Sequence, residues 1–352
     1  MAVDDRGIVV GITVYPGIST LKGPELDAEE FYDWLTSPAG GDVPSHHVDK
    51  IVSSRFQPAP PAPPASLPAY EVIQAFYRLQ AEAFANQIPR RLGRRLYIYA
   101  AGHGVGLSIR DDPDQSDAAF LIADATPYNT THVMVKFNAL YFLNAGIFDE
   151  VVVFMDCCRN PLSLTPNYPN YASAVNINQL GVQRRRFFAF ATRWGVNARE
   201  KQFNEATRGI FTTALMSGLK GAAAEADGKI TSRSLRDYLV NNMKSLMTDQ
   251  ELQEWDVQQP DIPDPDVDLV FATVTPPRVK VTVTFPANAG NQTIKLRGAG
   301  FELVASSQTV AGQPWEVPKE LSKGSYLVEI PALNLEKPFT LIGNERTVNV
   351  AL

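Results

Sequence analysis

The chain has 352 residues, of which 45% are hydrophobic and 20% charged, and its net charge is −6. This composition is typical of a globular protein with room for one large and one small domain, and it argues against a nucleic-acid binder that works by neutralising phosphates. No apolar run reaches the roughly 18 residues of a membrane span. The acidic start MAVDDRG lacks the basic and apolar regions of a signal peptide.

The first part of the chain, up to about residue 250, alternates short apolar runs with helical patterns. The predicted strands are 7–13, 48–53, 96–102, 119–124, 151–156 and 187–192. The predicted helices are 24–35, 70–88, 131–144, 209–219 and 231–247. Such alternation predicts an α/β fold with a mostly parallel sheet and helices on both faces.

Two segments within this part lack that pattern. Residues 57–68, QPAPPAPPASLP, are favoured as a stiff polyproline spacer, with a partner-docking motif as the less favoured alternative. Residues 111–117 are predicted to form an acidic surface loop.

The pattern changes after the proline-rich stretch 258–268. From residue 278 onward only short strand-like runs separated by turn residues remain, which predicts a small β-sandwich. We therefore expect two domains, 1–275 and 276–352.

The only two cysteines, Cys157 and Cys158, are adjacent. Consecutive Cα atoms lie about 3.8 Å apart, whereas ordinary disulfides need about 4.4–6.8 Å. We expect free thiols and a reducing cytoplasmic location. Two cysteines are also too few for a usual structural zinc site.

The chemistry is expected at two strand ends, because open parallel sheets bind ligands beyond the carboxyl ends of their strands. YIYAAG leads into His103, and VVVFMD leads into Cys157 and Cys158. An imidazole and a thiol at neighbouring strand ends suit a cysteine nucleophile and its base. Since side chains alternate along a strand, Cys158 shares a side with Asp156, and Cys157 is expected to be a buried filler.

These residues resemble the motifs of caspases and metacaspases. GHG at 102–104, DCC at 156–158, LKGPELDA at 21–28 and the stretch 209–239 are similar to those families in order and spacing, over roughly residues 5–245. The separation of His103 and Cys158, 158 − 103 = 55 residues, agrees with the roughly 50 residues known for caspases.

The resemblance implies a caspase-like cysteine endopeptidase. His103 would take the proton of Cys158, the thiolate would form an acyl-enzyme, and the backbone N–H groups of Gly104 and Cys158 would bind the oxyanion. Gly104 is expected to let the substrate carbonyl approach, because it lacks a side chain. No cofactor is expected, and the resemblance favours a monomer that acts on protein or peptide substrates.

The resemblance also implies specificity. Leu21 stands where caspases have an arginine that binds an acidic side chain. Asp27 and Asp156 match the two carboxylates that line the metacaspase pocket. Paired carboxylates attract a cation, so cleavage after Arg or Lys is predicted.

Some features leave alternatives open. The sequence RNPLS after Cys158 and Pro24 after Gly23 depart from the metacaspase pattern. The alternative function is a catalytically silent scaffold that acts through the C-terminal β domain, although His103 and Cys158 are both present. In a further alternative, that domain binds a regulatory partner or ligand and the protease domain is its effector.

Candidate metal and processing sites rest on composition alone. Calcium could bind the aspartates of the acidic segment, although a solvated loop is favoured; these are Asp111, Asp112, Asp114, Asp117 and Asp124. His46 and His47 are favoured as a solvated loop rather than a metal site, and His132 as the start of a helix. The run Arg184–Arg186 is equally consistent with self-cleavage and with a solvated stretch before a strand.

Overall fold

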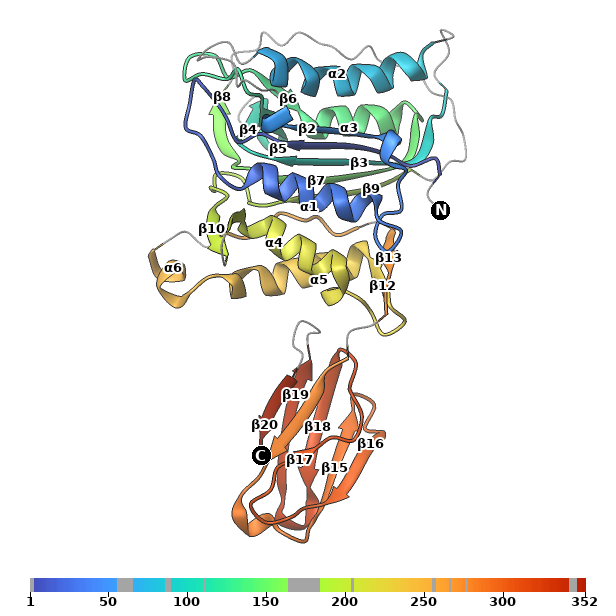
Figure 1. Ribbon diagram of the computed structural model, residues 1–352, viewed down its shortest axis with the longest axis vertical. Coiled ribbons are helices and arrows are strands. Elements are labelled where there is room, and N and C mark those ends of the chain that lie inside the picture. The colour runs from blue at the N-terminus through green and yellow to red at the C-terminus, as the bar shows by residue number, and fades with distance from the viewer. Residues whose placement is uncertain are drawn as a thin grey trace.

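The protein is described by a computed structural model for most of its length. The described residues are 3–55, 66–85, 90–109, 112–163, 184–203, 206–254, 258–265, 267–275, 278–341 and 347–352. Most of the proline-rich segment 57–68 lies outside them. An α/β part holds the N-terminal residues and a β-only part follows it (Figure 1).

A five-stranded parallel sheet forms the centre of the α/β part. Its order is β2-β1-β3-β7-β9. The strands are β1 (Arg6–Gly11), β2 (Val48–Val52), β3 (Gly93–Ala101), β7 (Phe148–Asp156) and β9 (Arg185–Phe190). All four pairings are parallel, which confirms the predicted sheet.

Helices cover both faces of this sheet (Figure 1). One face packs against α2 (Ser66–Ala83) and α3 (Val135–Asn144), and the other against α1 (Pro24–Thr36), α4 (Ile210–Ser217) and α5 (Ser232–Asn242). A short helix, α6 (Asp249–Glu254), follows. Along β1, Ile8 and Val10 enter one core while Val9 enters the other, so apolar residues are needed at every position.

A smaller sheet lies beside the carboxyl ends of the central strands. Its order is β6-β5-β4-β8. The strands are β4 (Gly104–Ile109), β5 (Asp112–Leu121), β6 (His132–Met134) and β8 (Asn160–Ser163).

Two predictions in this region are wrong. The segment expected as an acidic loop is largely strand β5, because its backbone pairs antiparallel with β4 and this pairing overrides its polar sequence. His132 begins strand β6, and helix α3 begins only at Val135.

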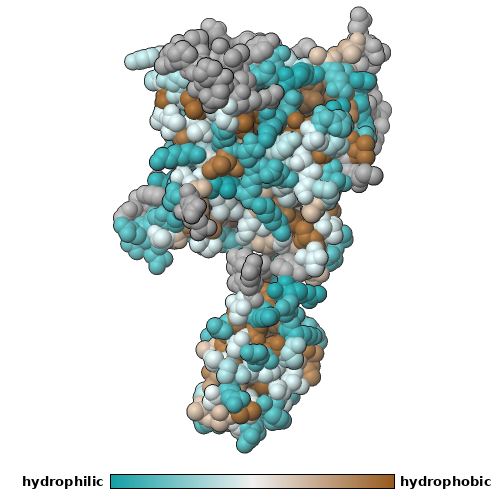
Figure 2. Space-filling view, in the orientation of Figure 1, coloured by the Kyte–Doolittle hydropathy of each residue, from teal (hydrophilic) through white to brown (hydrophobic). Residues whose placement is uncertain are grey.

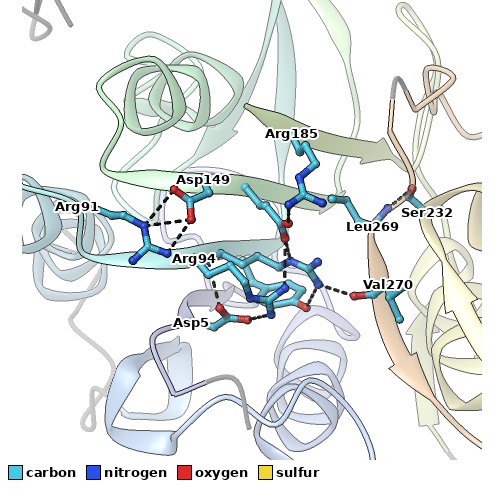
Figure 3. Close-up of polar contacts among 11 residues, drawn as sticks. Asp5, Arg91, Arg94, Asp149, Arg185, Ser232, Leu269 and Val270 are labelled. Carbon is cyan, nitrogen blue, oxygen red and sulfur yellow. Dashed lines mark hydrogen bonds and ion pairs between the residues drawn. The ribbon is translucent and has the colours of Figure 1, made fainter. Parts of the chain in front are cut away.

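An ion-pair network ties the amino ends of the central strands together (Figure 3). Arg95 Nε donates to Glu150 Oε2 at 2.6 Å, and both side chains are 2% exposed. Arg185 of β9 also pairs with Glu150, at 3.0 Å. Arg95 further donates to the carbonyl of Val270 at 2.9 Å. Val270 opens strand β13 (Val270–Thr273), which pairs antiparallel with β12 (Lys229–Thr231), so the network fastens the last strand of the α/β part to the central sheet.

The C-terminal part contains two sheets around a core of its own. Their orders are β17-β14-β20 and β16-β15-β18-β19. The strands are β14 (Lys280–Thr284), β15 (Thr293–Gly298), β16 (Leu303–Gln308), β17 (Trp315–Glu316), β18 (Gly324–Ile330), β19 (Leu335–Leu341) and β20 (Thr347–Ala351). Their buried side chains include Val281, Leu296 and Trp315. The all-β prediction is confirmed, and the domain boundary near residue 275 stays a prediction.

Figure 2 shows hydrophobic residues interspersed with hydrophilic ones on this face of the molecule. Such a mixture is normal for the surface of a folded protein. Within the described ranges, none of the helices combines the length and the apolar character that crossing a membrane requires.

Candidate active site

The candidate site begins where two neighbouring strands end in register. Ala101 at the end of β3 lies opposite Asp156 at the end of β7. His103 and Cys158 each follow two residues later. Both line a cavity of about 250 Å³ beyond the strand ends. The other lining residues are Leu21, Pro24, Asp27, Ala101, Gly102, Asp156, Asn197, Ala198, Arg199, Glu200 and Gly209.

The imidazole of His103 is held from two sides. Its Nε2 lies 2.7 Å from the carbonyl oxygen of Ser19. A carbonyl can only accept, so Nε2 carries the proton and Nδ1 is the basic nitrogen of the neutral ring. The hydroxyl of Tyr15 accepts the backbone N–H of His103 at 3.0 Å and donates to the carbonyl of Leu121 at 3.1 Å. The ring of Tyr15 meets the imidazole edge-on, with centroids 4.8 Å apart.

The two thiols lie in different surroundings. Cys158 is partly exposed in the pocket, and its Sγ lies 3.7 Å from the carbonyl of Ala198. Cys157 is buried in the apolar core, with Sγ 3.7 Å from the carbonyl of Ala100. Burial raises the pKa of Cys158 above its usual range and that of Cys157 much further. In this structure the thiol of Cys158 and the imidazole of His103 thus share a pocket while bonding to different partners.

The carboxylates of Asp27 and Asp156 lie close together in the lining of the pocket. Asp27 is 2% exposed; Arg208 Nε donates to its Oδ1, and the Gly209 N–H donates to its Oδ2 at 2.8 Å. Asp156 is 7% exposed, and its Oδ2 accepts the backbone N–H of Thr212 at 3.0 Å and the Thr212 hydroxyl at 2.8 Å. A Cβ at Gly209 would lie 2.1 Å from Asp156 Oδ2 and 3.0 Å from Asp27 Oδ2. The missing side chain at residue 209 therefore lets the two carboxylates approach.

The environment makes both carboxyl groups weaker acids. Burial, and next the charge of Asp156, raise the pKa of Asp27 to about 7, against the opposing effect of Arg208. Burial raises the pKa of Asp156 to about 6, although the hydrogen bonds from Thr212 oppose it. Asp27 and Asp156 therefore become more negatively charged as the pH rises from about 5 to 8.

A third carboxylate, Glu200, was missed by sequence reasoning. It begins the hairpin of β10 (Glu200–Phe203) and β11 (Ala206–Gly209), and the hairpin brings it to the pocket. Its Oε1 accepts the N–H of Gly23 at 2.7 Å and that of Lys22 at 3.2 Å. No motif or periodicity marks Glu200 in the sequence, because its place depends on contacts with residues nearly 180 positions away.

The structure shows that close packing requires a glycine at residue 104. A Cβ on Gly104 would lie 2.5 Å from the Cβ of Cys157 and 2.8 Å from the carbonyl oxygen of Cys158. Glycine is needed because β4 packs directly against the Cys157–Cys158 backbone. The role of the Gly104 N–H as an oxyanion donor stays a prediction.

The other candidate residues lie away from this pocket. Within the described ranges, no group of three or more His, Cys, Asp or Glu side chains could hold a metal ion. Asp124 accepts a hydrogen bond from the Thr131 hydroxyl at 2.5 Å. Asp111 and the side chains of Asp112, Asp114 and Asp117 lie outside the described residues. The imidazoles of His46 and His47 contact each other in a short 3₁₀ turn.

The arginine run partly belongs to the central sheet. Arg185 and Arg186 are the first residues of β9, and Arg185 pairs with buried Glu150. The ion pair gives Arg185 a structural role in the central sheet, and self-cleavage within the run remains an open alternative.

Comparison with known proteins finds a relative named for proteolysis. No family model matches this chain. A curated "probable protease" from a Desulfuromonadales bacterium is 27% identical over 66% of this chain and 27% of its own length. The matched part thus spans about a quarter of that relative.

Solved structures with a similar arrangement share little sequence. Caspase-1 from Spodoptera frugiperda is 14% identical, with a TM-score of 0.46 over 77% of this chain and 93% of that one. A protein from Geobacter sulfurreducens is 15% identical, with a TM-score of 0.44 over 74% of this chain and 95% of that one.

Proposed function

We propose that this chain is a cysteine endopeptidase of the caspase/metacaspase type that cleaves peptide bonds after arginine or lysine. One observation carries the proposal: an imidazole, a thiol and three carboxylates, those of Asp27, Asp156 and Glu200, line a single cavity at the carboxyl end of the central sheet. The similarity to a probable protease supports it.

His103 would generate the nucleophile during the attack itself. The pKa of Cys158 is raised by burial, so the thiol is protonated at neutral pH and needs a base. His103 Nδ1 takes the proton as Sγ leaves the carbonyl of Ala198 and bonds to the substrate carbonyl carbon. Throughout this step Nε2–H stays on the carbonyl of Ser19, which keeps the ring oriented.

The second half of the reaction returns that proton. The imidazolium donates it to the leaving amine when the C–N bond breaks, which leaves a thioester on Cys158. Water then attacks the thioester with His103 as its base, and the free acid and the thiol are released. The backbone N–H groups of Gly104 and Cys158 remain the predicted oxyanion donors.

The charge of the pocket supports a cationic residue before the cleaved bond. The pocket lining holds three carboxylates, those of Asp27, Asp156 and Glu200, against one arginine, Arg199, while Arg208 pairs with Asp27. The lining therefore contains more acidic than basic groups. A guanidinium or ammonium group would be attracted to the carboxylates. Leu21 lines the pocket where a caspase has its arginine, so it cannot neutralise this charge.

The proposal is tested by digesting a peptide library with wild type, Cys158→Ala and Cys157→Ala. We expect cleavage after Arg and Lys by wild type and Cys157→Ala, and none by Cys158→Ala. Library cleavage that persists in Cys158→Ala, or its absence in every sample, would contradict the proposal.

One observation favours the alternative of a catalytically silent scaffold. The raised pKa of Cys158 and the contact of its thiol with Ala198 describe a nucleophile that is not ionised in advance. The same digestion separates the two functions, because a scaffold cleaves nothing. The monomeric state remains a prediction that follows from the resemblance, and calcium binding remains the less favoured alternative that follows from composition.

A further inference from the structure

A segment beyond the last long helix packs against the pocket. Residues 258–262, here called the strap, lie between α6 and β13, where the sequence shows no strand or helix pattern. Asp261 and Phe190 exchange both backbone hydrogen bonds at 3.0 Å, so the strap is held at the end of β9.

Within the strap, the side chain of Gln258 joins two backbone segments. It is 1% exposed. Its Oε1 accepts the N–H of Arg199 at 3.0 Å, and its Nε2 donates to the carbonyl of Ala191 at 3.2 Å. The N–H of Ala191 in turn donates to the carbonyl of Met155 at 2.9 Å, in β7. One carboxamide therefore fixes the backbone at residue 199 to the end of the central sheet.

The position of that backbone matters to the candidate site. Residue 199 lies between Ala198, whose carbonyl meets the thiol of Cys158, and Glu200, whose carboxylate lines the pocket. We call residues 198–200 the pocket wall. A shift of the wall would move Glu200 relative to Asp27 and Asp156 and so change the fit of a cationic side chain.

A second contact anchors the strap beside the nucleophile. Arg159, directly after Cys158, has a side chain that is 5% exposed and ion-paired with Asp261. Its guanidinium also donates to the carbonyl of Thr192 at 3.3 Å and lies 4.6 Å from the ring centroid of Phe190. The segment RNPLS departs from the metacaspase pattern, and its first residue, Arg159, holds the strap in place.

We propose that Gln258 is a positioning residue for the pocket wall, so that the substrate site of this chain depends on the strap. The inference rests on the proposed cation-binding pocket. A glutamine suits the position because its carboxamide donates and accepts at once. Methionine of similar length can do neither, and asparagine is too short to reach both partners.

The test measures occupancy of the pocket without turnover. Cys158 is alkylated with iodoacetamide in the full chain, and the label is located by mass spectrometry. N-acetyl-arginine methylamide is added to protect the thiol, and the concentration that halves the alkylation rate is measured. The variants are Gln258→Met and Gln258→Asn; Gln253→Met, at an exposed glutamine of α6, is the matched control.

For both Gln258 variants we expect the half-protecting concentration to rise about tenfold, the effect of losing a buried hydrogen-bond pair. Alkylation without ligand should stay within about twofold of wild type, and the neutral citrulline analogue should protect none of the proteins. Gln253→Met should behave as wild type.

Three results would overturn the inference: equal protection in wild type and in both Gln258 variants, faster unprotected alkylation of Cys158 with new labelling of buried Cys157 in both variants, which indicates general loss of structure, or no protection of wild type. Failure of the proposed function has a different signature, because wild type would then be protected by the arginine amide but would cleave no peptide.

Discussion

The charge of Asp156 should decide the preference for arginine. A guanidinium about 5 Å from this carboxylate, at an effective dielectric constant of about 20, gains roughly 3 kcal/mol, or a factor of roughly 100 in affinity. Because the pKa of Asp156 is raised only to about 6, the group is ionised at pH 8. Asp156→Asn removes the charge and keeps an oxygen that can accept from Thr212.

The assay compares two fluorogenic peptides that differ only in arginine or citrulline before the cleaved bond. In wild type, kcat/KM should be much higher for arginine, and in Asp156→Asn that ratio should fall roughly 100-fold. Asp33→Asn, at an exposed position of helix α1, is the matched control and should leave the ratio unchanged. An unchanged ratio in a folded Asp156→Asn protein would refute the electrostatic reasoning.

Three further predictions concern ionisation and stability. The KM for the arginine peptide should fall as the pH rises from about 5 to 8, since the raised pKa values of Asp27 and Asp156 delay ionisation of the pocket; a KM that is flat with pH would count against this. Iodoacetamide should label Cys158 and leave buried Cys157 unmodified in the native protein; comparable labelling of both in a peptide map would contradict the two environments. Glu150→Gln should lower the free energy of unfolding in urea by about 3–5 kcal/mol, because Arg95 stays buried with its ionic partner removed; a loss below about 1 kcal/mol would show that the network adds little.

The parts of the site that follow strand ends were predictable. Long apolar runs mark β3 and β7, and parallel pairing brings their carboxyl ends to one edge. His103 and Cys158 therefore share a pocket, as the strand pattern suggested. The opposite orientation of Cys157 follows from the alternation of side chains along a strand.

The parts that depend on distant contacts were not predictable. Glu200 and Gln258 lie in segments without periodicity, and their roles come from hydrogen bonds to Gly23 and Arg199. Arg208 reaches Asp27 only after the chain has returned to helix α1.

Strand β5 differs from the predicted loop for another reason. Its acidic sequence favours a loop locally, and it is the pairing with β4 that makes it a strand. The partner strand is adjacent in the sequence, so the acidic composition, and not distance along the chain, concealed this strand.

The proposed catalytic pairing of His103 with Cys158 is tested most directly by a peptidyl-arginine chloromethyl ketone, with the adduct mapped by mass spectrometry. We predict a single adduct on Cys158 in wild type and a labelling rate at least about 100-fold lower in His103→Ala, since a positioned base contributes about that much. Equal labelling rates in the two proteins, or an adduct on another residue, would contradict the account.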